Sequence, residues 1–196
     1  MRPKAFDQNE ALGSAMFQFW NSGFAGSSMQ DLVDRMGISR QSLYDTYGNK
    51  RELFEAALRR YREEVIEPKL EAIGDPALPP PEAVREYFRS VVDAPKETPP
   101  GCLVVRSATE IPVTDHEIGA LLDECAMLAQ ETLCEVVERG QQTGDFDRSR
   151  SVRDLVGCIV AAAMGMHVMK RFPYGGRHLR PSVDALVAGL APRQDA

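Results

Sequence analysis

The segment around Gly37 constrains the fold more than any other part of this chain. Residues 28–54 read SMQDLVDRMGISRQSLYDTYGNKRELF, two short amphipathic stretches on either side of one glycine. A helix can end at Gly37 because a residue without Cβ adopts positive φ at little cost. Ser39 then offers an N-cap hydroxyl, which predicts a second helix over residues 40–47. The offsets that let two helices cross near a right angle are filled by Leu32, Met36, Ile38 and Leu43.

Two capping boxes predict where the neighbouring helices begin. Ser27 with Gln30 forms an S-x-x-Q box before the first helix of the pair, and Asn49 with Glu52 forms a similar box after the second. Three helix starts and one turn therefore agree in register, and the sequence predicts a helix-turn-helix.

This segment resembles the DNA-binding domain of TetR-family repressors, whose pattern is roughly T-x-x-x-I-A-x-x-A-G-V-S-x-G-x-L-Y-x-H-F-x-x-K-E-x-L. The matching or conservatively replaced residues are Ser28, Leu32, Gly37, Ile38, Ser39, Leu43, Tyr44, Lys50, Glu52 and Leu53. Upstream, the family's first helix is matched by Ala15, Phe19, Gly23 and Phe24, so the resemblance covers about residues 6–60. The departures are Val33 for a small residue, Gln41 for Gly, Thr46 for His and Tyr47 for Phe. Thr46 lacks a titratable group, which weakens any phosphate contact that the usual His makes.

The resemblance implies an all-α fold and a division of labour along the chain. It places a three-helix helix-turn-helix DNA-binding domain in residues 1–50 and a helical effector-binding and dimerisation domain in residues 51–196, with a connecting helix over about residues 50–72. Further helices are expected from the apolar periodicity and the caps at 82–94, 101–110, 114–139 with its stop at Gly140, 151–171 and 181–190. The alternative is a helical corner with no nucleic-acid role.

Charge indicates how such a protein would hold DNA. The formal net charge is −6, but residues 1–60 are close to neutral, so binding depends on a few local donors. Arg40 and Gln41 lie in the first turn of the recognition helix, where they can reach guanine O6/N7 and adenine N6/N7. Asp45 either accepts from a cytosine amine or remains a solvated carboxylate. The predicted DNA contacts are Ser28, Ser39, Arg40, Gln41, Ser42, Tyr44, Thr46, Tyr47 and Lys50, with Arg51, Arg2 and Lys4 as further phosphate donors.

The run 155–169 is apolar on all faces, whereas a peripheral helix of a monomer keeps one polar side. Gly157, Ala161 and Gly165 form one stripe that lets another helix approach closely. We expect this helix and the last one to pair with their copies in a twofold dimer, as the resemblance also implies, with two recognition helices about 34–36 Å apart. The alternative is an internal core helix. The predicted interface residues are Gly157, Ala161, Met164, Gly165, Val168 and Leu186.

The segment GCLVVRSATEI, residues 101–111, is similar to a GC-L-x-V-N-x-A-x-E run of many TetR-family regulators, in some of which the cysteine senses electrophiles or oxidants. Arg106 stands where Asn is usual. Cys102 near a helix start would have a lowered thiol pKa, and Arg106 one turn on would stabilise its thiolate. The two readings are a thiol sensor and a small buried hydrophobe.

A small-molecule effector is the other expected signal. An apolar cavity between helices is expected to involve Tyr87, Phe88, Leu103, Met127 and Met164, with Arg106, Glu110 and His116 as orienting polar groups. A soft copper(I) site is conceivable from Cys158, Met164, Met166, His167 and Met169, but their spacing suits core packing better, so no metal and no cofactor are expected.

Other function classes find little support in the sequence. There is no G-x-S-x-G, H-E-x-x-H or phosphate-binding glycine loop and no C-x-x-C pair, so an enzyme or zinc ribbon is not expected. The opening residues lack a secretory apolar region, and the longest uncharged apolar run has fifteen residues, so we expect a cytoplasmic protein without a membrane partner. The expected partners are double-stranded operator DNA, an effector and a second copy; a helical interaction protein is the remaining alternative.

Overall fold

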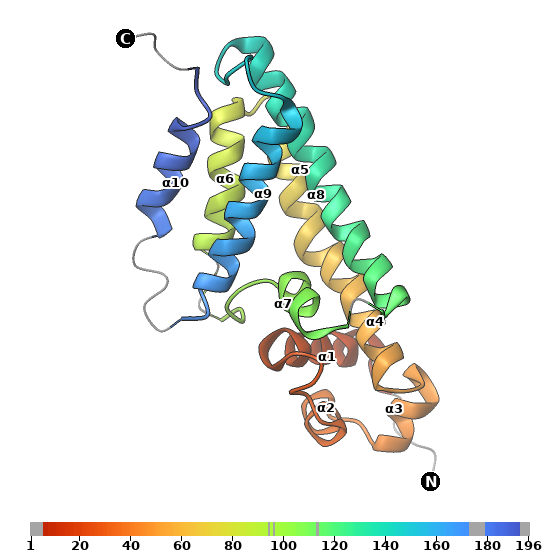
Figure 1. Ribbon diagram of the computed structural model, residues 1–196. Helices are drawn as coiled ribbons and strands as arrows, with labels where there is room; N and C mark the ends of the chain where they lie inside the picture. Colours follow the sequence, from red (N-terminus) through yellow and green to blue (C-terminus); the bar gives the residue numbers. More distant parts are fainter. Residues whose placement is uncertain (1–5, 94, 96, 113, 173–178, 193–196) are drawn as a thin grey trace. The chain divides into compact units, whose positions relative to one another are not determined.

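The computed structural model describes residues 6–93, 95, 97–112, 114–172 and 179–192, and these residues form helices and connecting turns with no strand (Figure 1). The all-α fold predicted from the sequence is confirmed. The chain divides into two compact units, the first made of residues 1–65 with 102–123 and the second of residues 66–101 with 124–196. A segment from the middle of the chain thus joins the amino-terminal helices in one unit.

The first unit is built around aromatic side chains of its amino-terminal helices. Phe19 lies edge-on to Phe54 with ring centroids 4.9 Å apart, and the Phe24 ring also lies 4.9 Å from Phe54 and 6.3 Å from Phe19. Trp20 packs edge-on against Tyr61. These contacts join α1 (Gln8–Ser22) to α4 (Lys50–Tyr61). The same unit also contains α2 (Met29–Met36), α3 (Arg40–Tyr47), α7 (Leu103–Glu110) and the beginning of α8 (His116–Thr143).

Local caps set the helix-turn-helix as expected, with one correction. Gly37 ends α2 in the left-handed region at φ 67°, and the Ser39 hydroxyl accepts from the Ser42 amide at the start of α3. The box at the start of α2 is one residue later than predicted: Ser28 is the N-cap, and its partner is Asp31. Ser27 is buried instead, and its hydroxyl donates to the Gly23 carbonyl at 2.7 Å, which satisfies the end of α1.

The connecting helix begins at Lys50 behind the expected Asn49–Glu52 box. It passes through a π-helical turn at Arg62–Ile66 and continues as α5 (Glu67–Gly74), so the expected extent to about residue 72 is nearly met. The boundary between the two units falls inside this π-helical turn. Such turns insert one residue into a helix and often occur where a helix serves a function.

The second unit packs around α6 (Pro80–Val92), which Figure 1 shows between α9 (Val152–Met169) and α10 (Leu179–Ala188). Phe88 on α6 and Phe146 after α8 are fully buried at the centre of this core, and Leu133, Leu155 and Ile159 pack into the same cluster. One side of each of the helices α5, α8, α9 and α10 is thereby covered.

The structure corrects several expected helix boundaries. The helix predicted to stop at Gly140 runs on to Thr143. A Cβ at Gly140 would overlap the Phe146 ring, so this glycine permits close packing and does not end the helix. Gly144, at φ 85°, is the residue that follows the last turn. At the other end, the helix expected from residue 114 begins at His116, and its cap is Asp115, whose carboxylate accepts from the Ile118 amide. The helices expected at 82, 101, 151 and 181 begin at Pro80, Leu103, Val152 and Leu179.

Candidate nucleic-acid interface

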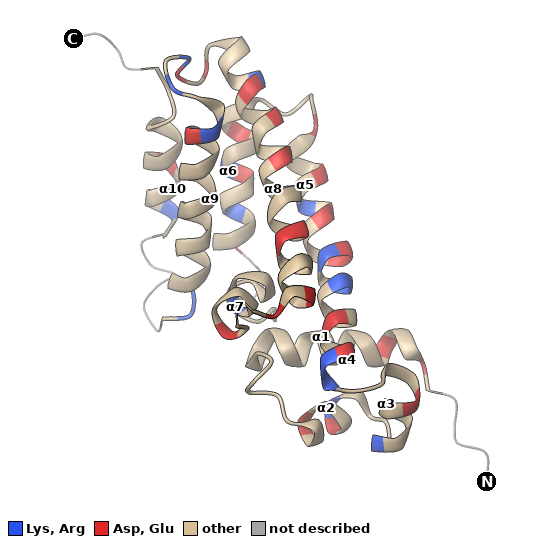
Figure 2. Ribbon diagram, turned by 45° about the vertical axis from the view of Figure 1, so that its right-hand side comes forward, with Lys and Arg blue, Asp and Glu red and all other residues tan. Residues whose placement is uncertain are grey.

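The recognition helix α3 buries one face and presents the other to solvent. Leu43 is fully buried beneath it, whereas Arg40 and Gln41 are exposed and the Tyr44 ring is 45% exposed. Figure 2 shows that α2 and α3 carry acidic as well as basic residues, in agreement with the nearly neutral charge of this part of the chain. The exposed side of α3 therefore offers hydrogen-bonding and aromatic groups with little net positive charge.

Several predicted DNA contacts already have partners inside the unit. The Ser28 hydroxyl caps α2, and the Ser39 and Ser42 hydroxyls lie 2.8 Å apart. Gln41 donates from Nε2 to Asp45 Oδ1 at 2.7 Å. The Tyr47 hydroxyl donates to the Gln8 carbonyl at 2.7 Å, and burial raises the pKa of Tyr47. Tyr47 thus joins α3 to α1, a role that the sequence did not indicate.

Lys50 does not project freely toward a phosphate. Its ammonium group lies 4.5 Å from the centroid of the Phe24 ring, a cation–π contact, and desolvation lowers the pKa of Lys50 while Asp31 and Glu110 oppose that shift. Lys50 therefore holds the turn after α1 against the start of α4. A phosphate contact by this lysine would require it to leave the ring.

Arg51, expected as a phosphate donor, is surrounded by carboxylates. It forms a two-pronged pair with Asp115 and also contacts Glu117 at 3.0 Å and Glu55 at 3.3 Å. The Arg51 hydrogen bond lowers the pKa of Asp115 to about 2, and the same pair raises the pKa of the guanidinium. Acidic residues more than sixty positions away thus balance the charge of Arg51, and a phosphate contact by this residue, which stays a prediction, would compete with them.

The carboxyl end of α1 is closed by a second polar cluster, which we name the α1 clamp and define as Arg106 and Glu110 of α7. Arg106 donates from Nη1 to the Asn21 carbonyl at 2.8 Å and from Nη2 to the Ser22 carbonyl at 2.6 Å. Its Nε bonds Glu110 at 2.6 Å, and the other oxygen of Glu110 accepts from the Phe24 amide at 3.0 Å. A cation on the last carbonyls of a helix also suits the helix dipole.

Gly23 is what lets the α1 clamp close. Its φ is 80°, and a Cβ there would overlap the Glu110 carboxylate and lie 2.5 Å from Arg106 Nε. Arg106 and Glu110 were expected to orient an effector; the structure shows them fastening α7 to α1, with all three guanidinium nitrogens bonded. The Arg106 guanidinium, expected to stabilise a Cys102 thiolate, thus bonds Glu110 and the last carbonyls of α1.

Helix α9 leaves an apolar stripe uncovered. A Cβ at Gly157 or Gly165 would meet nothing within 4 Å, and Met164 and Val168 are 44% and 43% exposed. The exposed members of the stripe are Gly157, Cys158, Ala161, Met164, Gly165, Val168, Met169 and Phe172. Among the described residues, α9 is the one helix long and apolar enough to cross a membrane, but Leu155, Ile159 and Met166 on its other side are buried in the core.

Comparison with known proteins decides the family. The family model for bacterial regulatory proteins of the tetR family matches residues 12–57, and the model for a tetracyclin repressor-like C-terminal domain matches residues 80–186. The chain belongs to the TetR family. It is a DNA-binding transcriptional regulator with a helix-turn-helix, as the resemblance implied.

Individual relatives agree with this assignment. The HTH-type transcriptional regulator YezE of Bacillus subtilis (strain 168) is 33% identical over 151 residues, which cover 74% of this chain and 76% of YezE. The HTH-type transcriptional repressor ComR of Escherichia coli (strain K12) is 27% identical over 172 residues, 87% of this chain and 82% of ComR. The TetR-family regulator CifR, solved as a cysteine mutant with 26-base-pair operator DNA, superposes with a TM-score of 0.83 at 28% identity, covering 97% of this chain and all of CifR.

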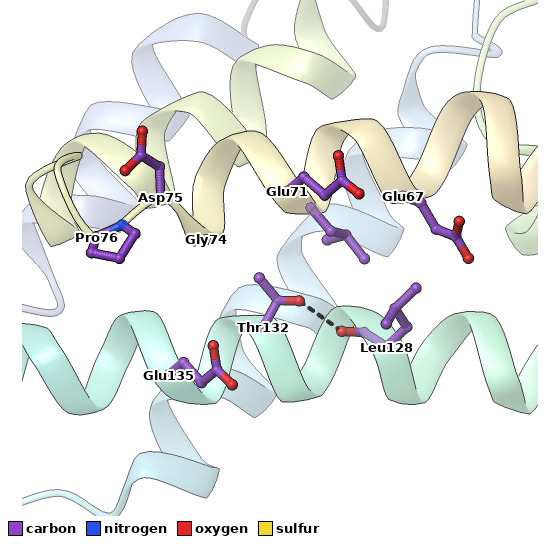
Figure 3. Close-up of a pocket in the computed structure, with 9 residues that line it drawn as sticks. Glu67, Glu71, Gly74, Asp75, Pro76, Leu128, Thr132 and Glu135 are labelled. Carbon is purple, nitrogen blue, oxygen red and sulfur yellow. Dashed lines mark hydrogen bonds between the residues drawn. The ribbon is translucent and has the colours of Figure 1, made fainter.

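The TetR-type C-terminal unit contains a cavity of about 490 Å³ between α5 and α8, which Figure 3 shows in close-up. Its walls combine apolar groups from Leu70, Leu128 and Pro76 with carboxylates. Thr132, on the α8 side, donates to the Leu128 carbonyl at 3.0 Å. The acidic residues that line the cavity are Glu67, Glu71, Asp75 and Glu135. This cavity was not predicted from the sequence, because its walls come from segments about sixty residues apart.

The residues expected to line an effector cavity are dispersed. Phe88 is fully buried in the core of the second unit with Tyr87 packed against it, whereas Leu103 is fully buried in the first unit. Met127 and Met164 line a groove of about 760 Å³ between α8 and α9. His116 is exposed at the start of α8.

The four cysteines are all free thiols, and no group of residues suited to a metal is found in the part of the chain that the structure describes. Cys102 is half-buried at the N-cap position of α7, where its side chain makes no capping hydrogen bond. Cys158 is exposed on α9, with its sulfur 3.6 Å from Arg150 Nη2. Cys125 is buried, and Cys134 lies in the groove between α8 and α9.

Proposed function

We propose that the protein is a homodimeric repressor that occupies a pseudo-palindromic operator and leaves it when a small molecule binds the C-terminal unit. The observation that carries the proposal is the exposed side of α3, a complete recognition helix with Arg40, Gln41 and Tyr44 toward solvent. ComR is a repressor by name, and CifR was solved on operator DNA. Such a protein works in the compartment that holds the DNA, which for a bacterial regulator is the cytoplasm.

The stripe on α9 supports the dimer. A monomer would leave this glycine- and methionine-rich face in water, whereas two copies related by a twofold axis would bury it against itself. Leu186 on α10 is half-buried beside the same core, so α10 is the second helix of the proposed four-helix contact. The alternative of an internal core helix is not favoured, because Ala161, Met164 and Gly165 are exposed.

The α1 clamp supports a route for the signal. Helix α7 is fastened to α1, and α8 begins in the first unit and continues into the second, as does the helix formed by α4 and α5. An effector that binds the cavity between α5 and α8 would act on two helices that both reach the DNA-binding unit. DNA affinity falls when the two heads can no longer meet both half-sites together.

A reporter assay tests this proposal. A fluorescent reporter is placed under the DNA that flanks the gene for this protein, and the protein is supplied from a second promoter. We expect lower fluorescence with the wild type than with Arg40→Ala, because a repressor needs its base-reading arginine. The protein purified from those cells is expected to bind the same DNA, and a duplex with one half-site scrambled should bind far more weakly. Unchanged or higher fluorescence with the wild type would contradict a repressor.

The second candidate is a thiol sensor acting through Cys102. CifR was solved as cysteine mutants, and NemR of Escherichia coli was solved in a reduced form, although the 16% identity of NemR shows the fold alone. Cys102 is half-buried at the start of α7, the helix that carries the α1 clamp. Against this candidate, the hydrogen bonds of Arg106 go to Glu110 and to the last carbonyls of α1.

Release from DNA by N-ethylmaleimide separates the two candidates. The comparison uses Cys158→Ser as the parent, because the exposed Cys158 lies on the proposed dimer face. If Cys102 is the sensor, the parent is released by N-ethylmaleimide and the Cys102→Ser, Cys158→Ser double variant is not. If N-ethylmaleimide releases neither the parent nor the double variant from DNA, the thiol candidate is wrong and the reversible effector remains as the signal.

A further inference from the structure

Gln41 and Asp45 form a side-chain pair on the exposed face of the recognition helix. Gln41 Nε2 lies 2.7 Å from Asp45 Oδ1, one helical turn apart. An ionised carboxylate can only accept hydrogen bonds, so the amide must turn its NH₂ group toward Asp45 and its carbonyl oxygen away. The carboxylate therefore decides the orientation of the amide, which glutamine alone leaves open.

That orientation matters for base reading. A glutamine reads adenine with two bonds, its carbonyl accepting from N6 and one amide hydrogen donating to N7. The NH₂ group has two hydrogens, so one can remain on Asp45 while the edge that carries Oε1 and the other hydrogen faces the base. The hydroxyls of Ser39 and Ser42 bond each other and that of Tyr47 bonds Gln8, so these three groups already have partners other than the amide.

The same carboxylate disfavours guanine. Guanine presents two acceptors, O6 and N7, in the major groove, and a carboxylate close to them has no proton to offer. We propose that Asp45 is a positioning residue for specificity: it holds the Gln41 amide so that each half-site is read as adenine, and not guanine, at one position. This inference rests on the proposed operator binding and adds the base class that the pair selects.

The experiment measures relative affinities for an operator library in which every half-site position carries each of the four bases. Fluorescence polarisation competition is run at two salt concentrations with the wild type, Gln41→Ala, Asp45→Asn and the double variant. We expect the wild type to prefer adenine at one position by about tenfold, in line with the 1–3 kcal/mol that one good pair contributes. Gln41→Ala should remove that preference.

Asp45→Asn should reduce the same preference at least threefold, because an asparagine can donate as well as accept and lets the glutamine amide turn. Its affinity for scrambled DNA should stay equal or rise, since a negative charge near the phosphates is removed. The double variant should match Gln41→Ala. A merely structural role for Asp45 would lower the affinity for all sequences alike.

The chain offers a matched control on the neighbouring helix. Gln30 and Asp34 of α2 form the same pair at 2.8 Å, so Asp34→Asn removes the same charge and the same kind of bond away from the recognition helix. We expect Asp34→Asn to keep the adenine preference. The inference is overturned if Asp45→Asn keeps the wild-type base preference, or if Gln41→Ala and Asp45→Asn change different positions. A wild type that prefers no operator over scrambled DNA would instead overturn the proposed function, and this inference with it.

Discussion

The two units of the chain differ in whether their side chains have found partners. At the junction of α1, α4 and α7, polar side chains from distant segments bond one another: Arg106 and Glu110 close α1, Arg51 is paired with Asp115, and Lys50 lies on Phe24. On α9, by contrast, a stripe of glycine, alanine and methionine is left exposed to solvent by the residues that the structure describes.

This difference indicates what each unit still lacks. The first unit has satisfied its internal junction and offers a polar helix to a polar partner, which suits the grooves of DNA. The second unit offers apolar surface, which suits another protein surface, and the simplest such surface is its own copy. Three variants or conditions test whether the contrast is real.

The largest effect is expected from a charge on the α9 stripe. Ala161→Glu would bury a carboxylate in the dimer contact, so we expect a monomer by light scattering and at least about a hundredfold weaker operator binding. Ala72→Glu, at an exposed position of α5, is the matched control and should remain dimeric. A dimeric Ala161→Glu with normal DNA affinity would show that the open face of α9 is not the dimer contact.

Acid should weaken the second unit through His167. Its Nδ1 is buried without a hydrogen-bond partner among the described residues, and burial, with help from Lys69 and Lys170, lowers the pKa of His167 to about 4 from 6.5. Above pH 6.5 the imidazole is neutral in both the folded and the unfolded state, so its contribution is complete. As the pH falls from 6.5 to 4 only the unfolded state takes up the proton, and the free energy of unfolding falls by about 3 kcal/mol.

Denaturant melts at several pH values measure this loss, and His167→Gln is the control. The variant should lose less stability than the wild type over that interval. The pair of Arg51 with Asp115 acts in a lower range, because the depressed pKa of Asp115 keeps its contribution complete above about pH 4 and removes it toward pH 2. An identical pH profile for His167→Gln and the wild type would show that His167 is not the titrating group.

The smallest expected effect distinguishes two glycines of the first unit. Gly23 and Gly37 both have positive φ, at 80° and 67°, but an added Cβ meets the α1 clamp only at Gly23. Gly37→Ala should cost about 1 kcal/mol of unfolding free energy from strain in the left-handed region. Gly23→Ala should cost about 2 kcal/mol, because its ψ of 174° puts it in a region that glycine alone adopts readily and because the clamp must also shift. Thermal melts of the two variants measure the difference, and equal losses would mean that the α1 clamp yields without cost.

The accuracy of the sequence-based predictions largely followed the range of the interactions involved, although the local box expected at Ser27 lies one residue later, at Ser28. The turn at Gly37, the cap at Ser39 and the box at Asn49 were all predicted correctly, because each depends on residues within three or four positions. The expected stop at Gly140 failed, because a glycine can also admit a ring from a later residue, here Phe146. Local spacing does not distinguish these two uses of glycine.

The features of the candidate site likewise fall into those set by neighbouring residues and those set by distant ones. The sequence by itself determined the helix-turn-helix, the exposed positions Arg40, Gln41 and Tyr44, and the uniformly apolar character of α9, because helical periodicity and caps are written in neighbouring residues. Only the tertiary structure decided that Arg106 and Glu110 close α1, that Arg51 is neutralised and that α9 keeps one face open. These outcomes depend on which distant segments meet, and a charged side chain takes the nearest suitable partner in space, wherever in the chain that partner lies.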